Sequence, residues 1–208
     1  MDSELKRYIE ERIIPLYDRF DKGHNRQHVE AVITQSLALA THYEVNEAMV
    51  YTIAAYHDTG LVKGRELHHL YSGEILASDR ELSPWFTPQQ IETMREAVED
   101  HRASSTHEPR SLYGRIVAEA DRQIDPMTIL RRTIQYGLAN YPELNKEGHY
   151  RRCLEHLHKK YATGGYLKLW IPESENARQL EELRSLITDQ TRLRQLFDEL
   201  FDRETGEE

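Results

Sequence analysis

Apolar residues recur at helical spacing along most of the chain, and no segment rich in Val and Ile shows the two-residue alternation of a half-buried strand. Thr163-Gly164-Gly165 is the strongest linker signal, and the apolar segment 166–171 is too short to assign. The pattern therefore predicts an all-α fold. The expected helices cover approximately residues 3–20, 26–43, 46–58, 68–80, 87–101, 111–125, 126–141, 146–161 and 174–203.

One predicted helix carries an imidazole and a carboxylate at its buried end. Its apolar face, which includes Ile53, continues by one turn to His57, and Asp58 follows directly. Asn46 is expected to cap the start of this helix, and Gly60 to end it with a positive φ. A buried charge without a partner costs roughly several kcal/mol. His57 and Asp58 therefore require a partner elsewhere in the chain.

Other predicted helices place side chains of the same kind on their apolar faces. For a single inward-facing histidine or aspartate, a hydrogen-bonded core residue is the commoner explanation. Six such groups in one small domain would leave several buried polar groups unpaired, and a divalent cation would pair them at once. The candidate metal ligands are His28, His57, Asp58, His68, His101 and Asp121.

Composition narrows the classes of protein that fit. The 208 residues suffice for one domain with a full core, and no apolar run reaches the length of a membrane helix. The single cysteine, Cys153, excludes an internal disulfide and a thiolate-rich metal site, and it fits a reducing cytoplasm. The net charge of −9 argues against broad binding to nucleic acid. We expect a cytoplasmic protein without a signal peptide. The sequence is compatible with a monomer and with a homo-oligomer.

The order of these residues resembles the motif of the HD superfamily of metal-dependent phosphohydrolases. That motif contains an upstream histidine, an adjacent His-Asp pair and a distant aspartate, which His28, His57-Asp58 and Asp121 match. The resemblance implies a helical HD domain over residues 20–126. Outside it, where the resemblance does not extend, we expect an N-terminal helix (1–19) packed on the domain and a C-terminal helical extension (127–208).

Two further histidines resemble the additional ligands of dinuclear HD enzymes. His68 stands four residues before the small residue Ser72, and His101 matches the histidine that follows in those enzymes. No Gly-Tyr-Pro segment follows His101, which argues against the branch that acts on cyclic dinucleotides.

The resemblance implies hydrolysis of a small-molecule phosphate ester, for which we expect a nucleotide, by metal-activated water. Asp58 would bridge two ions, of which one is completed by His28, His57 and Asp121 and the other by His68 and His101. The ligand set suits one or two ions of Mn, Fe, Zn, Co, Ni or Mg without distinguishing among them. Four cations in the flanking loops could bind phosphate: Arg102, Lys63, Arg65 and Arg110. Of these, Arg102 and Lys63 are assigned to catalysis.

Two other functions fit the same ligand set. A few HD-like proteins use these ligands for a di-iron site that oxidises an organic substrate. Alternatively, the chain could be a metal-stabilised binding module without catalytic activity. The loop cations favour a phosphate ester over the oxygenase substrate.

Overall fold

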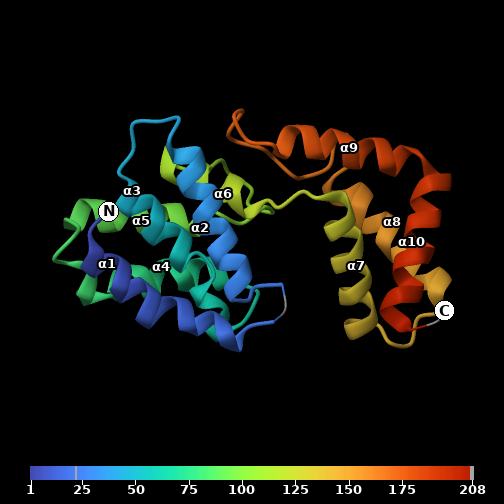
Figure 1. The fold of residues 1–208 in the computed structure, drawn as a ribbon, viewed down its shortest axis with the longest axis horizontal. Helices are drawn as coiled ribbons and strands as arrows, with labels where there is room; N and C mark the ends of the chain where they lie inside the picture. Colours follow the sequence, from blue (N-terminus) through green and yellow to red (C-terminus); the bar gives the residue numbers. More distant parts are fainter. Residues whose placement is uncertain (22, 207–208) are drawn as a thin grey trace. The chain divides into compact units, whose positions relative to one another are not determined.

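The computed structural model describes residues 1–21 and 23–206 (Figure 1). Within these residues the chain forms ten α-helices joined by short 3₁₀ and π segments, and it contains no strand, so the predicted all-α fold is confirmed. None of the described helices combines the length and the apolar character needed to cross a membrane. The chain divides into two compact units, Met1–Arg122 with Trp170–Ser174, and Gln123–Leu169 with Glu175–Glu208.

The first unit contains six α-helices around one apolar core, to which α2, α3, α5 and α6 all contribute buried side chains. Short 3₁₀ and π segments continue or follow α1, α3 and α4. In chain order the elements are α1 (Ser3–Tyr8), the π-helix η1 (Ile9–Ile13), the 3₁₀ helix η2 (Ile14–Arg19), α2 (Arg26–Ala40), α3 (Glu47–Tyr56), the 3₁₀ helix η3 (Thr59–Lys63), α4 (His68–Ser78), the 3₁₀ helix η4 (Arg80–Leu82), α5 (Pro88–Glu99) and α6 (Leu112–Asp121).

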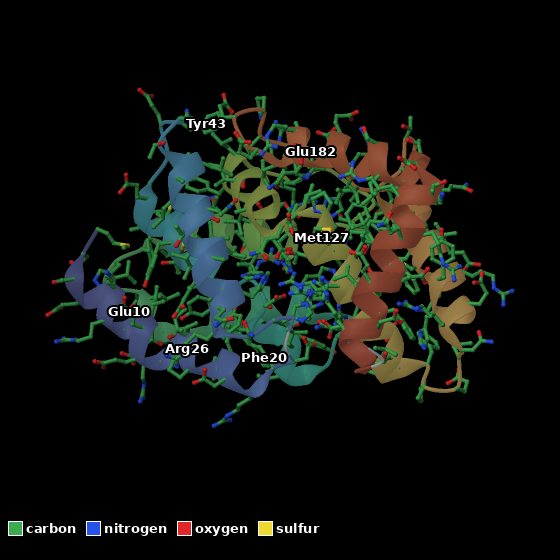
Figure 2. The ribbon with its side chains drawn as sticks, turned by 45° about the vertical axis from the view of Figure 1, so that its right-hand side comes forward. Glu10, Phe20, Arg26, Tyr43, Met127 and Glu182 are labelled. Atoms are coloured by element: carbon green, nitrogen blue, oxygen red, sulfur yellow. The ribbon has the colours of Figure 1, made fainter. Side chains whose placement is uncertain are left out.

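The N-terminal segment is helical as predicted, but only its first part is a regular α-helix. Pro15 has no N–H to donate to the preceding turn, and around it the chain changes to π and then 3₁₀ geometry. The apolar face survives the change, because Ile9, Ile13 and Tyr17 all remain buried. Glu10 and Arg26, which are labelled in Figure 2, are exposed.

The structure confirms the cap of α3 and corrects the reason for its terminal glycine. The Asn46 side chain accepts hydrogen bonds from the first turn of the helix. Gly60 does not have a positive φ; that conformation occurs at Gly64, after η3. A Cβ atom on Gly60 would lie 2.1 Å from the carbonyl oxygen of His68 and 2.5 Å from the nitrogen of Ser72. Gly60 is therefore required because η3 packs directly on the first turn of α4.

The loop between α5 and α6 is tied to the end of α5 by an ion-pair network. Asp100 is buried, and its carboxylate accepts from both the main-chain N–H and the guanidinium of Arg110. The same guanidinium contacts Glu99 at 2.7 Å. This network fixes the direction in which the chain leaves α5, immediately before His101.

The second unit consists of four α-helices: α7 (Pro126–Asn140), α8 (Lys146–Lys160), α9 (Asn176–Thr188) and α10 (Gln190–Thr205). The single long helix predicted over 174–203 is wrong. This segment forms two helices, α9 and α10, which are separated at Asp189. The Asp189 side chain accepts from the N–H of Arg192 and caps α10. The predicted linker at 163–165 is a turn that ends α8 within this unit, and Gly164 adopts a φ of 85° there.

A short segment from the C-terminal half belongs to the first unit. Within Trp170–Ser174, Ile171 is 3% exposed and joins the core. Glu119 on α6 is fully buried, and its carboxylate accepts from the main-chain N–H of Trp170 at 2.6 Å, from that of Ile171 and from the Ser174 hydroxyl. We call residues 170–174 the strap, because they complete a core built mainly by the first 122 residues.

Candidate metal centre

Six side chains of the metal-ligand type converge where helices of the first unit begin or end. His68 is the first residue of α4, and Asp121 is the last residue of α6. His57 and Asp58 directly follow α3. His28 lies in the first turn of α2, and His101 lies two residues beyond the end of α5. Because these residues occupy helix ends, their side chains can meet without a helix backbone between them.

The first group of donors lies on one side of Asp58. The Nε2 atoms of His28 and His57 are 3.2 Å apart. Asp58 Oδ2 is 3.6 Å from His28 Nε2 and 3.2 Å from His57 Nε2. Asp121 Oδ1 lies 3.2 Å from His28 Nε2 and 3.8 Å from His57 Nε2.

The second group lies on the other side of the same carboxylate. Asp58 Oδ1 is 3.3 Å from His68 Nε2 and 3.4 Å from His101 Nε2, and these two nitrogens are 3.2 Å apart. Asp58 thus directs one oxygen to each group. The structure therefore brings together all six residues that the sequence singled out.

Three of the four histidines have the same hydrogen bond on the side away from Asp58. The Nδ1 atoms of His57, His68 and His101 lie 2.6–2.8 Å from the carbonyl oxygen three residues earlier in the chain. A carbonyl oxygen can only accept, so each Nδ1 carries the hydrogen, and the neutral ring presents a lone pair on Nε2. His28 is the exception, since its buried Nδ1 has no hydrogen-bond partner in the described part of the chain.

This arrangement fits a divalent cation. In the neutral imidazoles of His57, His68 and His101, an acceptor nitrogen faces an acceptor oxygen of Asp58 at 3.2–3.4 Å. Such contacts are unfavourable unless a proton or a metal ion lies among the acceptors. Hydrogen bonds from the second ring nitrogen of a histidine to a backbone carbonyl are typical of metal sites, where they orient the ligand.

Without a metal, the carboxylates hold protons on some of the imidazoles. Burial opposes protonation of His28, but hydrogen bonds to Asp121 and Asp58 outweigh burial and raise its pKa to about 9. Burial also opposes ionisation of Asp58, but the electrostatic interaction with the adjacent His57 and hydrogen bonds from the surrounding imidazoles hold its pKa well below the usual range. A bound cation would replace these protons, so metal binding would release them.

His68 behaves differently from His28. Burial, and then the positive charge of His101, lower the pKa of His68 to about 4. Its ring is therefore neutral at neutral pH, the form that coordinates metal. The side chains of His68 and Asp121 are the most exposed of the six, at 13% and 23%.

The loop cations are less uniformly placed than the donors. Arg102 donates from Nη1 to the carbonyl of Glu66, next to the Arg65 carbonyl that orients His68. Arg65 lies 3.5 Å from Asp21, and Lys63 lies 3.4 Å from Glu74. The Arg110 guanidinium binds Glu99 and Asp100, as described above. The structure thus ties Arg102 to the loop that carries His68, and it pairs the other three cations with carboxylates.

Sequence reasoning missed the roles of two residues that shape the site. The buried Tyr17 hydroxyl donates to the Ala55 carbonyl and accepts from the main-chain N–H of Asp58. The Ser72 hydroxyl accepts from the N–H of Gly60 at 2.8 Å and fixes η3 against α4. Tyr17 stands four residues after Ile13 on the apolar face of the N-terminal helix, and this register was the signal that could have identified it.

Comparison with known proteins supports the same segment of the chain. Residues 25–123 match the family model of the HD domain, and all six donors lie inside this range. No significant match was found among curated proteins or among solved structures. The family match and the buried cluster of histidines and aspartates together confirm the resemblance drawn from the sequence motif. This chain therefore contains an HD domain, which spans residues 25–123.

Proposed function

We propose that this protein is a metal-dependent phosphohydrolase that cleaves a phosphate ester of a small molecule. The observation that carries the proposal is the position of Asp58, which directs Oδ2 towards His28 and His57 and Oδ1 towards His68 and His101. Each half of this arrangement offers at least three ligand atoms that lie within 4.8 Å of one another. One carboxylate shared by two such groups suits a pair of divalent ions.

In this proposal His28, His57, Asp121 and Asp58 Oδ2 hold one ion, and Asp58 Oδ1, His68 and His101 hold the other. When bound, the ions activate water and offset the charge of the phosphoryl group. The reaction forms a bond from the water oxygen to phosphorus and breaks the bond from phosphorus to the alcohol oxygen, which takes up a proton. The donor set suits Mn, Fe, Zn, Co, Ni or Mg.

The residues of the chain have three tasks in this reaction. The buried imidazoles present their Nε2 atoms in a fixed tautomer, so little reorganisation accompanies metal binding. Tyr17 fixes the main chain at Asp58. Arg102, which follows His101 directly and bonds to the Glu66 carbonyl before α4, is assigned to the phosphate, because a guanidinium can donate two parallel hydrogen bonds to phosphate oxygens. Lys63 is the second candidate for this contact.

The test combines metal analysis with a phosphatase assay. Purified wild-type protein should contain a divalent metal and hydrolyse 4-nitrophenyl phosphate, whereas Asp58→Ala should lose both properties. His42→Ala, a change of an exposed histidine at the end of α2, should retain both. Full turnover in Asp58→Ala would disprove the proposal. Bound iron with oxygen consumption and no phosphate release would favour the oxygenase, and bound metal without either activity would favour the binding module.

A further inference from the structure

Glu119 lies on the last turn of α6, two residues before the candidate ligand Asp121. Its side chain is fully buried, and its main-chain carbonyl accepts from the N–H of Arg122 at 3.1 Å. This hydrogen bond closes the turn that carries Asp121. A displacement of Glu119 would therefore move the backbone from which the Asp121 carboxylate extends.

Asp121 depends on this turn more than the other ligands depend on their helices. The rings of three histidine ligands are oriented by backbone carbonyls, and the main chain at Asp58 is fixed by Tyr17. Within the described part of the chain, the only hydrogen-bond or ion-pair contacts of the Asp121 carboxylate are with His28 and His57, which belong to the same group of donors. Its side chain is 23% exposed, against 5% for His28. The end of α6 is therefore the main support for this carboxylate.

The strap holds the side chain of Glu119 in place. The carboxylate accepts from the main-chain N–H of Trp170 at 2.6 Å, from that of Ile171 at 3.3 Å and from the Ser174 hydroxyl. A buried carboxylate requires such partners, because burial of an unpaired charge is strongly unfavourable. Release of the strap would leave this carboxylate without those donors and would loosen the turn that ends at Asp121.

We propose that Glu119 is a positioning residue for Asp121, and that docking of the strap thereby raises the affinity of the first group of donors for its ion. The inference rests on the two-ion centre of the proposed function, but it does not require that this centre hydrolyses an ester. Replacement of residues that orient metal ligands typically lowers metal affinity by about 10- to 100-fold. Because Glu119 acts through the backbone, we expect an effect at the lower end of this range.

The same coupling must act in the opposite direction. If the docked strap increases the affinity for the ion, the bound ion favours the docked strap by the same factor. The N–H groups of Trp170 and Ile171 bond to Glu119, so their hydrogen exchange reports undocking of the strap. Metal binding should therefore slow the exchange of these two amides.

The first test is calorimetric titration of the metal-free protein with Mn²⁺. Glu119→Gln should weaken binding of one of the two ions about tenfold and leave the affinity for the other unchanged, because α6 carries no ligand of the second group. Ser174→Ala removes one donor to Glu119 and should have the same effect on a smaller scale, so the test does not depend on the folding of Glu119→Gln. Ile9→Ala, at a fully buried position in η1, is the control for lost stability and should keep both wild-type affinities.

The second test is hydrogen exchange of the strap with and without Mn²⁺. In the wild-type protein, Mn²⁺ should slow exchange in the peptide that contains Trp170 and Ile171 about tenfold, the factor expected for the affinity. In Asp121→Ala this slowing should disappear, although the second group of donors can still bind its ion. Exchange in α10, which belongs to the second unit, should not change in either protein.

The outcomes separate this inference from the proposed function. Equal Mn²⁺ affinities in the wild type and Glu119→Gln would overturn the inference, and so would equal losses of affinity in Glu119→Gln and Ile9→Ala. Strap exchange that Mn²⁺ does not affect would also overturn it. If both tests give the expected results and 4-nitrophenyl phosphate is not hydrolysed, the inference stands and the phosphohydrolase proposal fails. If Mn²⁺ does not bind, both fail.

Discussion

The main-chain N–H of Asp58 donates to the Tyr17 hydroxyl at 3.2 Å, and the same hydroxyl donates to the Ala55 carbonyl at 2.9 Å. Tyr17 is fully buried and lies 41 residues before Asp58 in the chain. The N-terminal helix therefore does more than cover the core. Its phenol fixes the backbone at the one carboxylate that faces both groups of histidines.

Tyr17→Phe should lower the stability of the protein and weaken metal binding together. The substitution removes one donor and leaves the Asp58 N–H and the Ala55 carbonyl buried without this partner, at a cost of about 1–3 kcal/mol. Denaturant unfolding with parallel metal titration measures both effects. The control is Tyr8→Phe, which removes a part-buried hydroxyl bonded to Asp79 instead. Equal metal affinity in wild type and Tyr17→Phe would contradict a role for Tyr17 in positioning Asp58.

His68→Ala should separate the two groups of donors. The wild-type protein is expected to bind two ions, and the variant should keep one, since His28, His57 and Asp121 are unchanged. Metal content by elemental analysis, combined with calorimetric titration of the metal-free protein, gives the number of sites directly. A single ion in both the wild type and the variant would show that His68 does not hold a second one.

Arg102→Ala tests whether this cation contacts substrate or only holds a loop. We expect retained metal and an increase of about tenfold in KM for a phosphomonoester, with kcat changed less, because a phosphate contact contributes to binding. Arg12→Ala, on the exposed N-terminal helix, is the control. Loss of metal in Arg102→Ala would point to the other explanation, in which its hydrogen bond to the Glu66 carbonyl keeps His68 in place.

Glu119→Gln should destabilise the first unit by about 2–3 kcal/mol, because a carboxylate that accepts from two main-chain N–H groups and a hydroxyl is replaced by an amide with one acceptor. Urea unfolding measures the loss. Glu173→Gln provides the comparison on the strap itself, where an exposed carboxylate accepts from Tyr43. This change should lower the free energy of unfolding by less than about 1 kcal/mol. Similar losses in the two variants would contradict the importance of the buried contact.

The second unit should lose stability as the pH falls from about 6.5 towards 4. Burial, followed by the positive charges of Lys160 and Arg152, lowers the pKa of His156 to about 4. As the pH falls, the unfolded chain therefore takes up the proton on His156 before the folded chain does. The stability contributed by the neutral ring is fully present above the pKa of the unfolded chain and is lost as the pH falls from there towards the pKa of the folded chain. Partial exposure limits the effect to about 1 kcal/mol at pH 5.

His156→Gln should flatten this pH dependence, and the measurement is the free energy of unfolding at pH 7, 6 and 5. His158→Gln, an exposed position on the same helix, should keep the wild-type slope. An unchanged slope in His156→Gln would assign the acid sensitivity to other groups.

Local sequence signals located most helices and all six candidate ligands. The cap at Asn46 works over a few residues, and the stripes that include His28 and His101 follow from helical periodicity, so both could be read from the chain. The break at Asp189 was missed because the apolar stripe of 174–203 continues across it. An N-cap residue in the middle of a periodic segment was the available signal.

Contacts between distant segments could not be predicted in this way. The docking of the strap on Glu119 joins residues 51–55 positions apart, and no periodic pattern encodes such a pairing. The two directions of the Asp58 oxygens likewise depend on how five helix ends meet. The sequence also places Lys63 and Arg102 in loops, but only the structure shows that one pairs with Glu74 and the other bonds to a backbone carbonyl.

The strap also sets an order of events during synthesis. The ribosome completes α6, with Glu119, well before it reaches Ile171, which lies 52 residues later. At about 5–20 residues per second, this separation corresponds to a delay of roughly 3–10 s. During that interval the nascent first unit contains all six candidate metal ligands but lacks the hydrogen bonds that the strap donates to the Glu119 carboxylate. The strap can therefore complete the core of the first unit only after most of the second unit has been synthesised.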